Sequence, residues 1–295
     1  MISVLILTLN EEVNIEACIA SLPWRDDICV IDSESSDATA QIAASLGARV
    51  VKRPFLNYSD QRNFGLALPG KYEWILCLDA DERMTAELAT EIELQIKNAQ
   101  QQATMFRVRR KDMLMGRWLR RSSGYPTWFP RLMRRGCVRV ERDINEVYRT
   151  DGVTLNLKEH IIHYPLNKGI DWWFERHNRY SAMEAQVLSE KGPGNKISLA
   201  ALFSRDPSLR RENAKALIYR VPGRPFLIFC YLYVFRLGFL DGRAGYHYAC
   251  MRLAYELMID AKIASHTSNG EKCQQVGQQA TFPPSPAEGV RGNVS

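Results

Sequence analysis

The stretch that decides the fold runs from Trp74 to Asp81 and reads WILCLDAD: five apolar residues followed by two aspartates separated by an alanine. An unbroken apolar run of this length predicts a strand that is buried on both faces. Three more strands are predicted before it, at residues 2–9, 28–31 and 48–52, with helical patterns between them at residues 13–22, 38–46 and 58–68. Strands that alternate with helices at this spacing predict an α/β fold with a mainly parallel sheet flanked by helices.

The pattern becomes less regular after this first half. A helix is predicted at residues 87–101 and a strand at 105–110, and further helices at 170–190 and 199–219. We therefore expect a first domain over residues 1–220 and a helical, apolar extension over residues 221–263. Residues 264–295 are rich in Gln, Ser, Pro and Gly and have little to bury, which predicts a disordered tail.

Composition narrows the class of protein. The chain has 295 residues, of which 46% are hydrophobic and 24% charged, and this excludes a collagen, a coiled coil and a wholly disordered protein. The net charge of +6 is uneven: residues 107–149 hold 13 Lys and Arg against 4 Asp and Glu. Such a basic stretch predicts an anionic partner, which could be phosphate, acidic lipid or nucleic acid.

The cysteines and the N-terminus indicate the kind of cellular compartment in which the protein folds. The seven cysteines form no CxxC pair, and several lie in apolar runs, which favours a reducing compartment. Met1 is followed at once by apolar residues, without a basic region or a cleavage site, so we expect no signal peptide. The strongest apolar run, residues 225–235, is too short to cross a membrane, because a spanning helix needs roughly 20 apolar residues.

Acidic residues follow three of the predicted strands, at Glu11, Asp32 and Asp79. The carboxyl ends of parallel strands lie along one edge of a sheet, where open α/β folds bind ligands. Asp79 and Asp81 form a DxD pair, and residues i and i+2 of an extended chain point the same way. Two such carboxylates suit Mg²⁺ or Mn²⁺ shared with substrate phosphates, although a solvated acidic turn is the alternative. Neither GxGxxG nor GxxxxGK[ST] occurs.

Sequence blocks along the chain resemble a known enzyme family. SVLILTLNEEVNIEACIASL, VIDSESSDAT, DQRNFGLAL and WILCLDADERM, in this order, resemble the nucleotide-sugar half of family 2 glycosyltransferases, which have the GT-A fold. YPTWFPRLMRR, HYPLNKGIDWWFERHNRYS and FRLGFLDGRAGY are similar to the bacterial branch that includes lipopolysaccharide core β-glucosyltransferases. The resemblance covers residues 1 to about 263 and predicts a GT-A, Rossmann-like α/β sheet.

The resemblance implies a role for each matching residue. Seven residues would bind the nucleotide sugar: Thr8, Asn10, Glu11, Asp32, Arg62, Asp79 and Asp81. Asp32 would accept a hydrogen bond from the base, Arg62 would lie beside the nucleotide, and Asp79 would meet the ribose. Asp81 would hold the Mg²⁺ or Mn²⁺ that bridges the diphosphate, which offsets the charge on the leaving group.

An inverting transfer also needs a general base for the acceptor hydroxyl. The matching position in this sequence is Glu146, preceded by Asn145 where the family usually has His. Nearby carboxylates are alternative bases, and Glu146 could instead offset neighbouring arginines; the residues concerned are Glu141, Asp143, Arg142 and Arg149.

Two further residues, Arg131 and His163, are candidate contacts for the acceptor or the diphosphate. A histidine at a strand end is more often structural, and the five histidines show no metal-binding spacing. Arg131 belongs to a basic run beside Trp128 and Phe129, which could also be a solvated face or a stacking surface for single-stranded nucleic acid. No nucleic-acid-binding motif is present, so we expect no nucleic-acid partner.

The extension at residues 221–263 combines many apolar side chains with interspersed arginines. This mixture is typical of helices at a membrane surface, with arginine at the head groups and rings in the acyl boundary. An internal helix pair and an oligomer interface are the alternatives. We therefore expect membrane association.

The sequence as a whole thus predicts an inverting hexosyltransferase that uses a nucleoside-diphosphate sugar, with a UDP-sugar favoured. The acceptor would be a hydroxyl of a lipid-linked or cell-envelope glycan, such as lipopolysaccharide core or exopolysaccharide, at the cytoplasmic face of the inner membrane. Two alternatives stay open: a nucleotidyltransferase on a similar sheet, and a non-catalytic basic module that binds lipid or nucleic acid.

Overall fold

The computed structural model describes residues 1–98, 102–141, 146–190, 217, 219 and 221–279. The chain forms two compact units. The first combines Met1–Phe174 with Phe226–Arg252, and the second combines Glu175–Pro225 with Leu253–Ser295. The expected domain boundaries at residues 220 and 263 stay predictions.

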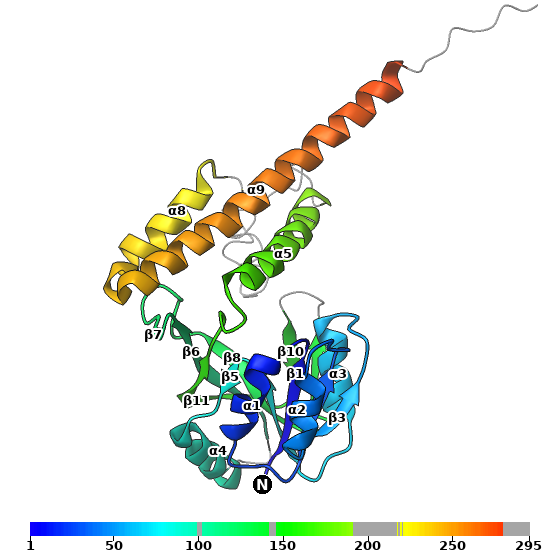
Figure 1. Ribbon diagram of the computed structural model, residues 1–295, viewed down its shortest axis with the longest axis vertical. Helices are drawn as coiled ribbons and strands as arrows, with labels where there is room; N and C mark the ends of the chain where they lie inside the picture. Colours follow the sequence, from blue (N-terminus) through cyan, green and yellow to red (C-terminus); the bar gives the residue numbers. More distant parts are fainter. Residues whose placement is uncertain (99–101, 142–145, 191–216, 218, 220, 280–295) are drawn as a thin grey trace, which may run out of the picture. The chain divides into compact units, whose positions relative to one another are not determined.

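The first unit is built on a mixed sheet with the strand order β3-β2-β1-β4-β8-β6-β11-β5, and β7 pairs with β6 (Figure 1). The first four strands along the chain are mutually parallel: β1 (Ser3–Thr8), β2 (Ile28–Asp32), β3 (Arg49–Lys52) and β4 (Trp74–Asp79). The other strands of the sheet are β5 (Glu82–Arg83), β6 (Ala103–Leu114), β7 (Arg117–Trp118), β8 (Trp128–Arg134) and β11 (Val153–His163). Strand β8 runs antiparallel to both β4 and β6, whereas β11 runs parallel to β6.

Helices cover both faces of this sheet. Successive side chains of a strand point to opposite faces, and the central strands carry apolar side chains on both, so both faces need to be covered. On one face, residues such as Val4, Ile6 and Leu76 pack against three helices: α1 (Glu12–Ala20), α2 (Thr39–Ser45) and α4 (Ala86–Asn98). On the other face, Leu5 and Cys77 belong to a core that includes residues of α3 (Tyr58–Ala67) and of a hairpin formed by β9 (Val138–Glu141) and β10 (Val147–Thr150). The predicted α/β fold with a mainly parallel sheet flanked by helices is confirmed.

A helical segment after the sheet also belongs to the first unit. It consists of the end of α8 (Arg224–Cys230), a π-helical turn (Tyr231–Phe235), a short 3₁₀ helix (Gly238–Asp241) and the start of α9 (Gly242–Gln279). The buried carboxylate of Asp241 fixes this segment to the chain after β7, because its Oδ2 accepts bonds from Arg121 N at 2.9 Å and from Ser122 N and Oγ at 2.8 Å. Arg236 donates to the carbonyl oxygens of Arg121 and Tyr125.

The second unit contains most of α5 (Ile170–Glu190) and the later part of α9. Arg224 is 2% exposed and pairs with Glu256 and Asp260 of α9. Helix α9 is continuous to Gln279, whereas the composition predicts an unstructured chain from Ala264. The helix expected at residues 199–219 lies outside the described residues, apart from positions 217 and 219, and so do residues 280–295.

Candidate active site

The strand register brings the predicted site residues to one edge of the sheet. Thr8, the last residue of β1, pairs with Asp32, the last residue of β2, and Leu7 pairs with Asp79 at the end of β4. The three strands therefore end level with one another, as expected for a ligand-binding edge of a parallel sheet.

Hydrogen bonds join the loops that follow β1 and β2. Asp32 is fully buried, and its Oδ1 accepts bonds from Thr8 Oγ1 at 2.9 Å and from Ser35 Oγ at 2.5 Å. Asn10 adopts a positive φ of 54°, and its Oδ1 accepts a bond from Ser36 N at 2.8 Å. Asp32 therefore organises this pair of loops; its predicted contact with a base stays a prediction.

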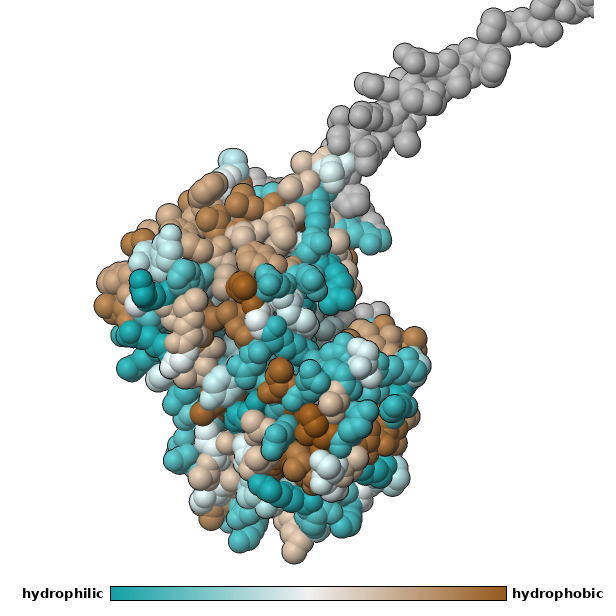
Figure 2. Space-filling view, in the orientation of Figure 1, coloured by the Kyte–Doolittle hydropathy of each residue, from teal (hydrophilic) through white to brown (hydrophobic). Residues whose placement is uncertain are grey.

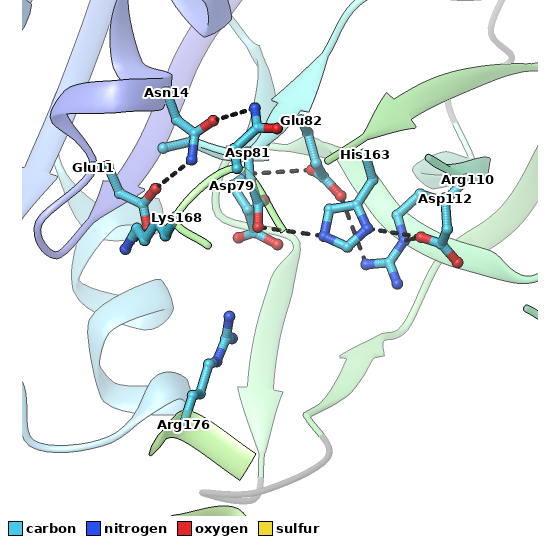
Figure 3. Close-up of polar contacts among 12 residues, drawn as sticks. Glu11, Asn14, Asp79, Asp81, Glu82, Arg110, Asp112, His163, Lys168 and Arg176 are labelled. Carbon is cyan, nitrogen blue, oxygen red and sulfur yellow. Dashed lines mark hydrogen bonds and ion pairs between the residues drawn. The ribbon is translucent and has the colours of Figure 1, made fainter. Parts of the chain in front are cut away.

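Glu11 follows Asn10 in the loop after β1, and its carboxylate contacts two side chains. Its Oε2 accepts a bond from Asn14 Nδ2 at 2.9 Å, and its Oε1 pairs with Lys168 Nζ at 2.5 Å (Figure 3). Burial raises the pKa of the Glu11 carboxyl, and Lys168 partly offsets that effect. Lys168 also lies 4.3 Å from the centre of the Trp172 ring, and its ion pair with Glu11 joins the segment after β11 to the loop after β1.

Two buried arginines converge on Asp79. Arg62 of α3 donates from Nη2 to Asp79 Oδ1 at 2.8 Å, and Arg131 of β8 donates from Nη2 to Asp79 Oδ2 at 2.6 Å. Arg131 also donates to Glu82 Oε1 at 2.8 Å. Burial raises the pKa of Asp79, but the attraction of Arg131 and Arg62 outweighs burial and holds it well below its ordinary value. Asp79 is therefore a fixed anion at this edge of the sheet.

Asp81, the second member of the DxD pair, lies beside His163. Strand β5 pairs with the end of β11, and this pairing brings His163 Nε2 to within 3.3 Å of Asp81 Oδ2 (Figure 3). On its other side, His163 Nδ1 lies 2.7 Å from Asp112 Oδ1. Burial lowers the pKa of His163, but Asp81 and Asp112 raise it more, to about 9. The structure thus places His163 between two carboxylates, next to the predicted metal ligand.

Asp81 is suited to a divalent cation, and His163 could join it as a ligand only after losing the proton that its raised pKa retains. Mg²⁺ and Mn²⁺ prefer oxygen ligands, and Mg²⁺ is commonly bound through one or two carboxylates together with phosphate and water. Among the residues that the structure describes, no group of three His, Cys, Asp or Glu side chains has the arrangement of a metal site. The fit therefore depends on substrate oxygens completing the coordination around Asp81.

Glu146, the predicted base, comes from the hairpin and not from the main sheet. It directly precedes β10, and its carboxylate accepts bonds from Arg62 Nε at 2.8 and 2.9 Å and from the Tyr148 hydroxyl at 3.0 Å. The side chain is 17% exposed. Glu141, an alternative base, is bound by the exposed side chains of Arg139 and Arg149. Asp143 and Arg142 lie outside the described residues.

The structure therefore places the ten predicted site residues in three groups. The first, around the loops after β1 and β2, is Thr8, Asn10, Glu11 and Asp32; the second, at the end of β4, is Arg62, Asp79, Arg131 and Glu146; the third is the pair Asp81 and His163. Sequence reasoning missed Asp112, Tyr148 and Lys168. Lys168 does stand in the HYPLNKG block used for the resemblance, so that block carried a usable signal.

The fold and this edge of the sheet fit one family. The family model described as "Glycosyl transferase family 2" matches residues 3–162, which is more than half of the chain. The chain belongs to glycosyl transferase family 2.

Relatives named as glycosyltransferases agree with this membership, and a solved structure shares the fold. An uncharacterised glycosyltransferase of Rickettsia bellii is 47% identical over 93 residues, and the match spans 31% of each chain. The lipopolysaccharide core biosynthesis glycosyltransferase LpsC of Rhizobium meliloti is 28% identical over 200 residues, or 65% of this chain and 73% of LpsC. A mannosyltransferase of Pyrobaculum calidifontis, solved with GDP-Man and Mn²⁺, is 14% identical with a TM-score of 0.50 over 89% of this chain and 86% of its own, which shows the shared fold.

Proposed function

We propose that this protein transfers a hexose from a nucleoside-diphosphate sugar, with a UDP-sugar favoured, to a hydroxyl group of a glycan. In this reaction the acceptor oxygen forms a bond to the anomeric carbon, and the bond from that carbon to the diphosphate oxygen breaks. The configuration is inverted because attack comes from the side opposite the leaving group. The acceptor proton goes to an enzyme carboxylate, and a nucleoside diphosphate leaves.

The observation that supports this best is the meeting of Asp79 and Glu146 on Arg62 at the end of β4. These three residues come from the sheet, the hairpin and α3, yet they converge two residues before Asp81. A transferase of this kind needs a leaving-group site and a proton acceptor within reach of one sugar. The arrangement offers both functions along one edge.

Each side chain then has a defined task. Asp81 would hold Mg²⁺ or Mn²⁺, which would supply positive charge to the leaving diphosphate, and His163 could join it as a ligand once the cation displaces its proton. Glu146 would accept the proton of the attacking hydroxyl. The loops organised by Asp32 and Asn10 would bind the nucleoside.

Donor binding can be measured by thermal unfolding with UDP, GDP, dTDP and CMP, each with and without Mn²⁺. A ligand that binds only the folded state stabilises it by about 2.7 kcal/mol at 100 times its Kd, and we expect one nucleotide to raise Tm by about 5 °C or more in a metal-dependent way. Identical treatment with inorganic phosphate is the control for unspecific anion binding.

Two outcomes would contradict the proposal. If no nucleotide changes Tm at millimolar ligand and metal, the chain has no donor site of this kind, and a basic binding module is favoured. If the protein releases no nucleoside diphosphate from an activated sugar, and instead joins a nucleoside triphosphate to a sugar phosphate with release of pyrophosphate, it is a nucleotidyltransferase.

We further propose that the acceptor is a lipid-linked or cell-envelope glycan, such as lipopolysaccharide core or exopolysaccharide. Similarity to LpsC over 65% of the chain supports an acceptor of this class. A donor from the cytoplasm and an acceptor anchored in a bilayer would meet at the cytoplasmic face of the inner membrane, and we place the enzyme there.

The helical segment at residues 226–240 supports contact with a membrane. Its exposed side chains are mostly apolar, and Figure 2 shows hydrophobic residues gathered over this part of the molecule: Phe226, Leu227, Tyr231, Val234, Phe235, Leu237, Phe239 and Leu240. Exposed arginines stand nearby in the same unit, at positions 117, 120, 121 and 243. Among the described helices none alone meets the length and hydropathy of a membrane span, and one bent pair, Arg224–Phe235 with Gly238–Ser265, meets them together. Rings beside arginines suit an anionic lipid surface.

Membrane contact predicts a specific loss on substitution. Phe235 is 78% exposed, and we expect Phe235→Glu to weaken binding to vesicles of phosphatidylethanolamine and phosphatidylglycerol about tenfold or more, since burying a phenylalanine contributes about 1.5–3 kcal/mol. Leu94→Glu is the matched control, because Leu94 is 54% exposed on α4. Sedimentation with vesicles measures both. Equal binding by the two variants, or no binding by the unchanged protein, would contradict the membrane proposal.

A further inference from the structure

Three consecutive residues of α3 connect three separate elements of the first unit. Gln61 donates from Nε2 to Ser33 Oγ at 3.0 Å in the loop after β2. Arg62 reaches Asp79 and Glu146, and Asn63 reaches strand β9. Successive side chains of a helix point about 100° apart, so one turn can contact three different neighbours. We call Gln61, Arg62 and Asn63 the α3 clamp.

Arg62 uses its guanidinium to hold two carboxylates at a fixed separation. The residue is 5% exposed, and its Nε contacts both oxygens of Glu146 while its Nη2 contacts Asp79. Charge-assisted bonds from a planar guanidinium are directional, unlike those of a lysine ammonium. Only Nη1 has no hydrogen-bond partner among the residues that the structure describes. All the observed bonds from this guanidinium therefore go to protein carboxylates.

Asn63 attaches the hairpin that carries Glu146. Its Nδ2 donates to the Val140 carbonyl at 2.8 Å, and its Oδ1 accepts a bond from Val140 N, also at 2.8 Å. Val140 lies in β9, which pairs over four residues with β10, and Glu146 directly precedes β10. The side-chain amide thus acts like a neighbouring strand at one point of β9, and it fixes the hairpin to α3.

Together these contacts fix the position of Glu146, the candidate base, through both its side chain and its backbone. Asn63 fixes the backbone of the hairpin, and Arg62 fixes the carboxylate of Glu146 relative to Asp79, two residues before Asp81. We infer that Arg62 and Asn63 are positioning residues for Glu146, and this inference rests on the proposed transferase function. Reaction rates respond steeply to such placement, because a displacement of 1 Å can cost about 10²-fold.

The inference predicts a separation of kcat from KM. We expect Asn63→Ala and Arg62→Lys to lower kcat about 10²-fold, while the KM for the donor and the Tm increase with nucleotide change less than about threefold. Lysine keeps the positive charge but cannot bridge two carboxylates as the guanidinium does. Glu146→Gln, measured in parallel, gives the rate that remains without the base.

A matched control comes from the same helix. Asn57 is the N-cap of α3, and its side chain accepts a bond from Asp60 N. Asn57→Ala removes an asparagine of the same helix and should cost about 1 kcal/mol of stability, yet it leaves the hairpin attached. We expect its kcat to equal that of the unchanged protein, so loss of helix stability alone cannot explain the effect of Asn63→Ala.

Hydrogen exchange tests the attachment without any activity measurement. Amide exchange at residues 138–141 and 147–150 should become faster in Asn63→Ala and stay unchanged in Asn57→Ala. An unchanged exchange rate in Asn63→Ala overturns the inference, whatever the protein's activity. If the unchanged protein transfers sugar, a full kcat in Asn63→Ala overturns it too, and a raised donor KM with full kcat in Arg62→Lys would identify Arg62 as a nucleotide contact. If the unchanged protein transfers sugar from none of the donors, that result refutes the proposed function, and the hydrogen-exchange result still decides whether Asn63 attaches the hairpin.

Discussion

Replacing Asp81 by asparagine is expected to reduce hexose transfer by at least about 10³-fold, since the leaving diphosphate would lose the charge that the cation supplies. Asparagine keeps the size of the side chain but removes a negative ligand. The same variant should lose the metal-dependent part of the nucleotide's Tm increase while it still binds nucleotide weakly. Steady-state kinetics and thermal unfolding with and without Mn²⁺ measure the two effects.

A control on a helix of the same unit separates this effect from a general change of charge. Glu16 is exposed on α1, and Glu16→Gln removes one negative charge without touching Asp81 or His163. We expect Glu16→Gln to transfer sugar at the normal rate. Asp81→Asn with near-normal turnover, in a protein whose fold is intact, would rule out the metal-binding role of Asp81.

The parallel half of the sheet could be predicted because three of its four strands, β1, β2 and β4, are mostly apolar. Residues of β1, β2 and β4 are buried on both faces, and a strand of this kind has a sequence signal that needs no partner to be recognised. The positions of Asp32 and Asp79 followed directly, since both end such strands.

Of the later strands, β6 was predicted at residues 105–110, but β8 was missed for a physical reason. Strand β8 contains Pro130 and Arg131, residues that argue against an internal strand. The structure accommodates Pro130 opposite Arg107, beside an irregularity in the pairing of β6 with β8. Arg131 is tolerated because Asp79 and Glu82 pair with it. Local patterns cannot reveal a partner that is about 50 residues away.

The same limit applies to the site. The family resemblance predicted a role for Glu146, but not its contact with Arg62, which lies 84 residues away in the chain. Of the arginines that could have offset Glu146, Arg149 pairs with Glu141 instead. Asp112 had no sequence signal at all, because its importance comes only from its position beside His163.

His163 gives a prediction about stability and pH. Its pKa is raised from 6.5 to about 9 in the folded protein, so the folded state holds a proton that the unfolded state releases above pH 6.5. The stabilisation is complete below pH 6.5 and is lost as the pH rises towards 9. We expect the free energy of unfolding of the unchanged protein to fall by about 3 kcal/mol relative to His163→Gln between pH 6 and 9. Urea unfolding of metal-free protein measures this difference.

His160 provides a control of opposite sign. Burial and the nearby Lys111 lower its pKa, so the folded state takes up this proton less readily than the unfolded state. Protonation of His160 therefore destabilises the folded protein as the pH falls below 6.5. Well above that pH, His160 does not change how the free energy of unfolding depends on pH. His160→Gln should thus leave the loss of stability between pH 7 and 9 unchanged, while His163→Gln removes most of it. Parallel curves for the unchanged protein and His163→Gln over that range would mean that His163 is not held as a cation between Asp81 and Asp112.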